Sequence, residues 1–196
     1  MLKRISVMFL AALFLASNAF AGPTELVKKT VDEVVHIVSD KEMKKNETKR
    51  RQALKKSISV IFDYPEMAKR SMGKHWNARS AAEKKHFAEL FATLLENSYA
   101  SKIESYNNEK IVYVKEIVET DHAEIKSKVV TAARDEFTLD YRLMNHNGTW
   151  MVYDVVIEGV SLVSNYRSQF NKIITTNGYE HLVKKLQSKN DELKAP

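Results

Sequence analysis

Residues 150–170 read Trp150-Met-Val-Tyr-Asp-Val-Val-Ile-Glu-Gly-Val-Ser-Leu-Val-Ser-Asn-Tyr-Arg-Ser-Gln-Phe170, and this segment predicts more of the fold than any other. It follows Asn147-Gly148, a dipeptide typical of a two-residue β-hairpin turn. A strand is predicted up to Ile157, and Gly159 interrupts it. Apolar residues then recur at helical spacing, at Val160, Val163, Tyr166, Phe170 and Ile173. The segment supplies apolar surface on a strand and on a helix, and it contains no motif of a catalytic site.

The hairpin turn predicts which residues of the two strands face each other. The expected pairs are Asn145 with Trp150, Leu143 with Val152, Tyr141 with Asp154, and Leu139 with Val156. In this register we expect a hydrogen bond between the Asp154 carboxylate and the Tyr141 phenol. Both faces of strand 149–157 are rich in apolar residues. Either helices cover both faces, or one face packs on the core while the other lines a cavity.

The rest of the chain predicts helices before the sheet and helices after it. Helical periodicity and end signals indicate helices over residues 23–38, 48–62, 65–72, 80–106, 160–177 and 179–189. Ser80 and Glu83 form a capping box at the start of the longest helix. A period of two indicates strands at 110–118, 122–132, 137–145 and 149–157. This order predicts an α+β fold in which N-terminal and C-terminal helices pack on a four-stranded antiparallel meander.

The N-terminus has the features of a secretory signal peptide over residues 1–21. Lys3 and Arg4 precede an apolar run, and Ala19-Phe20-Ala21 is a typical cleavage site. Residues 22–196 are expected to form a single domain, because no linker or repeat divides them. The chain of 196 residues has no cysteine, which excludes a lipidated cysteine anchor and disulfides. That composition suits the bacterial periplasm, where free thiols would be oxidised.

The chain is basic, with 31 Lys and Arg against 25 Asp and Glu. This balance fits either an ordinary solvated surface or a weak attraction to anionic lipid headgroups or to an acidic partner. The scattered charges of an exported chain do not favour nucleic acid. The densest basic run is expected on the solvated side of an amphipathic helix and comprises Lys44, Lys45, Lys49, Arg50, Arg51, Lys55 and Lys56.

Motifs of enzymes and of metal sites are weak. Ser71-Met-Gly-Lys74 matches the S-x-x-K pattern of serine enzymes, but the chain has no K-T-G partner, and Gly73 is better explained as a helix end. The six histidines form no recognised pair of metal ligands. A catalytic function would have to use Asp154 or Tyr141 as an acid or base in a small-molecule pocket.

Two blocks of sequence carry a family likeness. The first is Phe62-Asp-Tyr-Pro-Glu-Met-Ala-Lys-Arg-Ser-Met-Gly-Lys-His-Trp76, and the second is the segment 150–170. They resemble the patterns F-D-[FY]-x-x-M-A-x-x-x-L-G-x-x-W and W-x-V-Y-D-V-x-I-E-G-V-S-L-x-x-x-Y-R-x-x-F of the Mla-type toluene-tolerance proteins, the periplasmic phospholipid carriers. Met72 stands where that family usually has leucine. The likeness extends over residues 25–190.

The resemblance implies a soluble periplasmic carrier of phospholipid that is not an enzyme, and we expect a monomer. It implies a curved sheet, cupped by helices around a deep apolar pocket that holds acyl chains and leaves the headgroup near the mouth. It also implies lipid exchange with an outer-membrane lipoprotein complex and with an inner-membrane ABC transporter that carries a substrate-binding ring. Such a pathway maintains the lipid asymmetry of the outer membrane. No metal or organic coenzyme is implied.

We expect the pocket wall to come from apolar residues of the helices and of the hairpin. The predicted lipid-binding residues are Phe62, Met67, Met72, Trp76, Phe91, Leu94, Leu95, Leu139, Tyr141, Leu143, Val152, Val160, Val163 and Tyr166. Ordinary core packing is the alternative for each of them. Arg167, in the Y-R-x-x-F pattern, is the predicted headgroup contact, with an exposed surface arginine as the alternative. The competing functions are a periplasmic chaperone or adaptor that binds apolar peptide, and a carrier of another small apolar ligand.

Overall fold

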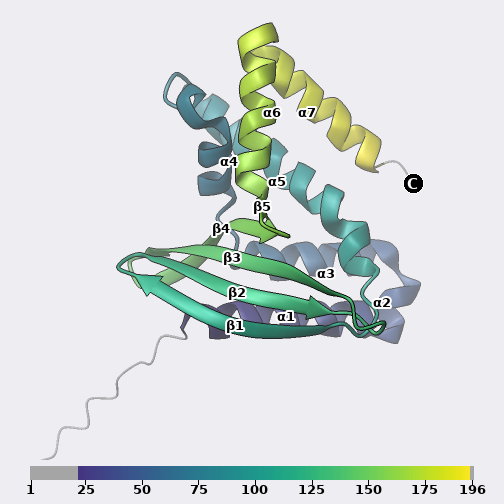
Figure 1. Cartoon of the computed structure of the whole chain (residues 1–196). Helices are drawn as coiled ribbons and strands as arrows, with labels where there is room; N and C mark the ends of the chain where they lie inside the picture. Colours follow the sequence, from purple (N-terminus) through teal and green to yellow (C-terminus); the bar gives the residue numbers. More distant parts are fainter. Residues whose placement is uncertain (1–21, 195–196) are drawn as a thin grey trace, which may run out of the picture.

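The computed structural model describes residues 22–194, in which a helical half stands on a half built around a β-sheet (Figure 1). The helices are α1 Pro23–Ser39, α2 Lys41–Lys45, α3 Glu47–Ser59, α4 Tyr64–Met72, α5 Ala81–Glu104, α6 Leu162–Asn177 and α7 Tyr179–Lys194, with a short 3-10 helix, η1, at Gly73–His75. The predicted signal peptide, residues 1–21, lies outside the described residues. None of the helices within residues 22–194 is long and apolar enough to cross a membrane.

The sheet is a curved antiparallel meander with the order β1-β2-β3-β4-β5. Its strands are β1 Lys110–Glu119, β2 His122–Val130, β3 Glu136–His146, β4 Thr149–Ile157 and β5 Val160–Ser161. The predicted α+β class is confirmed, but the sheet has five strands and not four. The fifth is only two residues long and pairs Ser161 with Val156 and Val160 with Ile157. A strand this short leaves no period of two in the sequence, and the helical spacing that starts at Val160 concealed it.

Local chemistry explains where the elements begin and end. The Ser80 hydroxyl accepts a hydrogen bond from the Glu83 amide at 3.2 Å, and the Glu83 carboxylate accepts one from the Ser80 amide at 2.7 Å, which is the predicted capping box. Helix α4 ends at Gly73, whose φ of +53° favours glycine. Asn147 and Gly148 both have positive φ, +52° and +93°, as a two-residue type I′ turn requires.

The predicted hairpin register holds near the turn and fails beyond it. Asn145 faces Trp150 and Leu143 faces Val152, as predicted. A β-bulge between Leu143 and Arg142 then leaves Tyr153 as an extra residue on β4. The actual pairs beyond the bulge are Arg142 with Asp154, Tyr141 with Val155, Asp140 with Val156 and Leu139 with Ile157. The predicted pairs of Tyr141 with Asp154 and of Leu139 with Val156 are therefore wrong, and so is the expected Tyr141–Asp154 hydrogen bond.

The two halves have separate hydrophobic cores. The core of the helical half contains packed rings, with Phe87, Phe91, Tyr166 and Phe170 making contacts at centroid distances of 5.1–6.2 Å. The core of the sheet half joins the inner face of the sheet to α1. Residues 61–63 connect the halves along β4, because the Val152 amide donates to the Ile61 carbonyl at 2.6 Å and the Asp63 amide donates to the Val152 carbonyl at 2.9 Å.

Candidate functional site

A cavity of about 800 Å³ lies in the sheet half, between the inner face of the sheet and helices α1, α3 and α5. Its volume is near the upper end of the range of roughly 300–1,000 Å³ that is typical of ligand pockets. One wall is a stripe of α1 and consists of Val27, Val31, Val34, Val35 and Val38. The opposite wall is the sheet, where Leu139, Tyr141, Val155 and Ile157 line the cavity. The wall is therefore mainly apolar.

Helix α1 is held at its two ends, and the cavity lies along its length. At its start the Thr24 amide donates to the Glu116 carboxylate of β1 at 2.9 Å, and Val27 is fully buried against the sheet core. At its end, Ile37 and Val38 pack on Leu54 of α3 in a small separate core. Between these ends Val31, Val34 and Val35, which are only partly buried, line the cavity.

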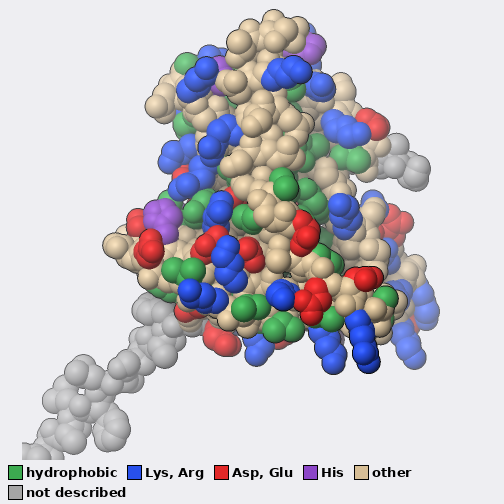
Figure 2. All heavy atoms as spheres, in the orientation of Figure 1, with side chains coloured by type: hydrophobic (Ala, Val, Ile, Leu, Met, Phe, Trp, Pro, Cys, Tyr) green, Lys and Arg blue, Asp and Glu red, His purple; other side chains and the backbone are tan. Residues whose placement is uncertain are grey.

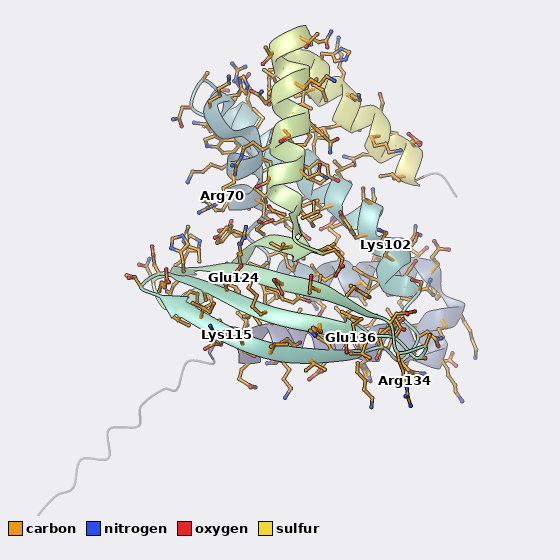
Figure 3. All side chains as sticks on the ribbon, viewed as in Figure 1. Arg70, Lys102, Lys115, Glu124, Arg134 and Glu136 are labelled. Carbon is orange, nitrogen blue, oxygen red and sulfur yellow. The ribbon has the colours of Figure 1, made fainter. Side chains whose placement is uncertain are left out.

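The mouth of the cavity is marked by lining residues that are exposed to solvent. They are Arg51, Gln52 and Lys55 of α3, Lys102 and Ser105 at the end of α5, and Phe137 of β3. Figure 3 shows Lys102 on the lower part of α5, above the end of the sheet that carries Arg134 and Glu136. Three of the six residues are cationic. The rim is thus suited to an anionic group, whereas the interior is suited to apolar chains.

A smaller polar cluster interrupts the apolar wall. The Lys55 ammonium forms an ion pair with the Glu96 carboxylate at 2.9 Å, and both residues line the cavity together with Tyr64 and Asn97. Burial, and then the neighbouring Glu96 carboxylate, raise the pKa of the Tyr64 phenol far above its usual range. The Asn97 side-chain nitrogen is buried and has no hydrogen-bond partner within residues 22–194. Asn97 therefore has an unused donor in the part of α5 that borders the cavity.

Neither residue proposed for acid–base chemistry has a suitable setting. Burial raises the pKa of Tyr141 well above its ordinary value, so the phenol in the cavity wall stays neutral at physiological pH. Asp154 does not line the cavity. Its carboxylate accepts hydrogen bonds from the Ser161 hydroxyl at 2.6 Å, the Val163 amide at 3.1 Å and an Arg142 guanidinium nitrogen at 3.3 Å. Asp154 thus fixes the start of α6 on the sheet.

The structure separates the predicted lipid-binding residues into two groups. Five line the cavity, namely Phe62, Met67, Leu95, Leu139 and Tyr141. The other nine lie outside its wall. Met72, Phe91, Leu94 and Val163 are buried in the helical core, on which Trp76 and Tyr166 also pack; Leu143 and Val152 are buried in the sheet core; and Val160 is 57% exposed. The separate helical core accounts for six of the nine, because a second core is not visible as a periodicity.

The predicted headgroup contact, Arg167, also lies outside the cavity wall. Its Nε donates to the Arg70 carbonyl at 2.6 Å, and its side chain passes over Gly73, where an added Cβ would lie 3.4 Å from Cδ. Arg167 therefore joins α6 to the end of α4. The cationic residues that do line the cavity are Arg51, Lys55 and Lys102.

The main residues that sequence reasoning missed belong to α1 and α3. The valine stripe of α1 was visible as a broad apolar stripe, but the sequence did not show that a cavity would separate it from the sheet. Its breadth was the available signal, since one helix face with Leu26 and five valines exceeds what contact with a single neighbour requires. Within residues 22–194, no three His, Asp or Glu side chains are close enough together to hold a metal ion.

Comparison with known proteins gives consistent matches. The family model described as "MlaC protein" matches residues 28–188. A Haemophilus influenzae protein named "Intermembrane phospholipid transport system binding protein MlaC" is 28% identical over 59% of this chain and 56% of its own length, so the match spans little more than half of that relative. The "Toluene tolerance protein ttg2D" of Pseudomonas putida is 26% identical over 90% of this chain and 84% of its own.

A solved structure supports the same fold. It is the phospholipid-binding protein of Ralstonia solanacearum, described as a complex with a phospholipid. Its TM-score with this chain is 0.81 at 24% sequence identity, and the alignment covers 89% of this chain and all of the other. At this level of identity the likeness concerns the arrangement of helices and strands.

Proposed function

The chain belongs to the MlaC protein family, and from that premise we propose that it is a phospholipid-binding transport protein whose cavity holds the acyl chains of one lipid. Two of the three relatives named above support the substrate class, since they are named or described for phospholipid. The observation that carries the proposal is the apolar cavity of about 800 Å³ with a cationic mouth.

The size of the cavity suits acyl chains. If a methylene group takes about the space of a water molecule, roughly 30 Å³, then about 800 Å³ has room for on the order of 25 such groups. A diacyl phospholipid exposes about 30 methylenes, and at roughly 0.8 kcal/mol each their transfer to water costs about 24 kcal/mol. A carrier removes this cost by offering an interior comparable with the bilayer. The apolar wall of α1 and the sheet provides such an interior.

We assign the anionic phosphate to the mouth. Arg51, Lys55 and Lys102 are the cationic lining residues, and all three are exposed. A phosphate at the rim keeps its charge in contact with water, and so avoids the large cost of burying an ion. The unused Asn97 donor lies further along the same wall and suits an ester carbonyl of the lipid.

The wider role follows from the family. We propose that residues 1–21 direct export, that residues 22–196 act as one domain, and that the protein works as a monomer in the periplasm. In that compartment it would exchange phospholipid with an outer-membrane lipoprotein complex and with an inner-membrane ABC transporter complex that carries a substrate-binding ring. The pathway would maintain outer-membrane asymmetry. The carrier needs no catalysis, metal or coenzyme, because its cargo is not changed chemically.

The direct test is native mass spectrometry of the protein purified without detergent. The expected result is a mass excess that organic extraction resolves into phospholipid, with one lipid for each chain. A protein that has no bound lipid and that fails to acquire any from liposomes would contradict the proposal. Bound peptide instead of lipid would favour the chaperone function.

A further inference from the structure

One segment concentrates the charge of the whole molecule. Residues 41–56 contain eight Lys or Arg and two Glu, an excess of six positive charges, which equals the formal net charge of +6 for the complete chain. This segment comprises α2 and most of α3. Figure 2 shows Lys and Arg side chains gathered at the lower right of the molecule, where Figure 1 places α2. The remaining sequence is balanced in charge.

Part of this charge is not neutralised within the protein. Arg50 and Arg51 form ion pairs with Glu104, and Lys55 forms one with Glu96. Lys44, Lys49 and Lys56 are exposed and form no ion pair with any residue between 22 and 194. The unpaired lysines extend over both α2 and α3. They therefore leave a positive surface on the solvent side of these helices.

The positive surface adjoins the mouth of the cavity. Arg51 and Lys55 belong to the same helix as Lys49 and Lys56, and they line the cavity. Lys49, Lys56 and Val60 are spaced at i, i+7 and i+11, so they follow one face of the helix and its continuation. Val60 is 67% exposed, which is the highest exposure among the large hydrophobic residues of the described chain. A row of cations thus ends in an exposed apolar side chain, and Gln52, at the mouth of the cavity, lies one helical turn from both lysines.

We propose that this α2–α3 surface docks the protein on membranes that contain anionic phospholipid, with the mouth of the cavity close to the bilayer. Lysines near an anionic bilayer are attracted by its surface potential, and each strengthens binding by roughly fivefold. A bilayer fits better than a protein partner, because protein interfaces are depleted in Lys and are built around aromatic residues and Arg. On this surface Lys predominates, and the exposed apolar residue is a valine that can enter the interfacial layer.

The proposal deepens the proposed function, since it gives the cavity an orientation for loading and release. The docking itself is a separate property from the binding of lipid in the cavity. A protein with full lipid content and no affinity for anionic vesicles would refute the docking alone. Absence of bound lipid in the same preparation would refute the carrier function. Native mass spectrometry and vesicle binding on one sample therefore distinguish the two failures.

The test compares two double variants with equal changes of charge. Lys49→Glu with Lys56→Glu alters the docking surface, whereas Lys184→Glu with Lys185→Glu alters exposed lysines of α7 in the helical half. Co-sedimentation is measured with phosphatidylcholine vesicles, with and without phosphatidylglycerol, at low and at high salt. We expect binding only to the vesicles with phosphatidylglycerol, and weaker binding at high salt because the charges are screened. The α3 variant should bind at least about 25-fold more weakly, and the α7 variant much less so.

Two results would overturn the docking proposal. One is equal loss in the α3 and α7 variants, which would show that only net charge matters. The other is binding of an acidic protein surface at this site in the absence of any vesicle binding. Circular dichroism spectra and melting temperatures of both variants check that each one is folded. Both changes are at exposed positions, so we expect melting temperatures close to that of the unchanged protein.

Discussion

The helical half and the sheet half use their apolar residues in opposite ways. In the helical half, Phe87, Phe91 and Phe170 are almost completely buried and pack edge to face, so the interior is filled. In the sheet half, the valines of α1 and the inner face of the sheet are separated by a cavity of about 800 Å³. The filled half can stabilise the fold. The hollow half can hold a ligand, because its walls gain apolar contacts only when the cavity is occupied.

The largest difference in stability is expected between substitutions of two leucines, one in each half. Leu182 of α7 is completely buried in the helical core, whereas Leu139 of β3 lines the cavity. Leu182→Ala should lower the free energy of unfolding by about 2–5 kcal/mol, as in other packed cores. Leu139→Ala should cost about 1 kcal/mol or less in lipid-free protein, because it enlarges an existing space. Urea unfolding of delipidated protein measures both. Equal losses would show that the cavity wall is packed like a core.

The second largest loss of stability is expected at the junction of the two halves. Asp154→Ala should destabilise the protein by about 2–3 kcal/mol, because it removes the acceptor of Ser161 and of the Val163 amide and leaves Arg142 without this partner. Arg142 is partly exposed, which keeps the estimate below that for a fully buried pair. Thermal unfolding provides the measurement. If Asp154→Asn is nearly as stable as the unchanged protein, the hydrogen bonds at the start of α6 account for most of the loss. If it is as unstable as Asp154→Ala, the ion pair with Arg142 accounts for it.

A cavity-filling substitution tests function without a large change in stability. Leu139→Trp places a larger side chain in the wall of the cavity and should reduce bound phospholipid at least about fivefold, since the added ring competes with the acyl chains for volume. Val112→Trp, on the exposed side of β1, is the control and should keep its lipid. Lipid content after organic extraction is the readout. Full occupancy in Leu139→Trp would mean that this wall does not contact the lipid.

The smallest effect is a pH dependence in the sheet half. Burial raises the pKa of Tyr113 to about 12, while an unfolded tyrosine titrates near 10. The unfolded chain therefore loses its phenolic proton first. The stability associated with Tyr113 is fully present below about pH 10 and is lost as the pH rises towards 12.

Tyr113→Phe should reduce this alkaline loss. The Tyr113 hydroxyl is buried without a hydrogen-bond partner in the described chain, so its removal should be neutral or slightly stabilising at pH 7. Urea midpoints at pH 7 and above pH 10 test both statements. If the urea midpoint of the variant falls with pH as steeply as that of the unchanged protein, the alkaline loss belongs to other tyrosines with raised pKa values, among them Tyr64 and Tyr141.

Local signals in the sequence accounted for most elements and for their ends. The Asn147-Gly148 turn, the capping box of Ser80 and Glu83 and the helix end at Gly73 are each decided by a few neighbouring residues, and the structure has all three. The cavity wall was predicted only in part. Whether an apolar residue such as Phe91 or Leu139 meets a neighbour or a cavity depends on the distance between whole elements, and a one-dimensional pattern does not contain that distance.

The bulge at Tyr153 reverses the side-chain alternation along β4. On the turn side of the bulge, odd and even positions of β4 have one assignment of faces, and beyond it they have the other. If Tyr153 paired regularly with Arg142, Asp154 would lie opposite Tyr141 in the cavity wall and Val155 would turn away from it, whereas deletion of Tyr153 would leave both residues on their present faces. A regular β4 of the same length would thus exchange an apolar for a charged wall, and the extra residue in the bulge prevents this. The position of the bulge, as much as the composition, is the property that this strand has to keep.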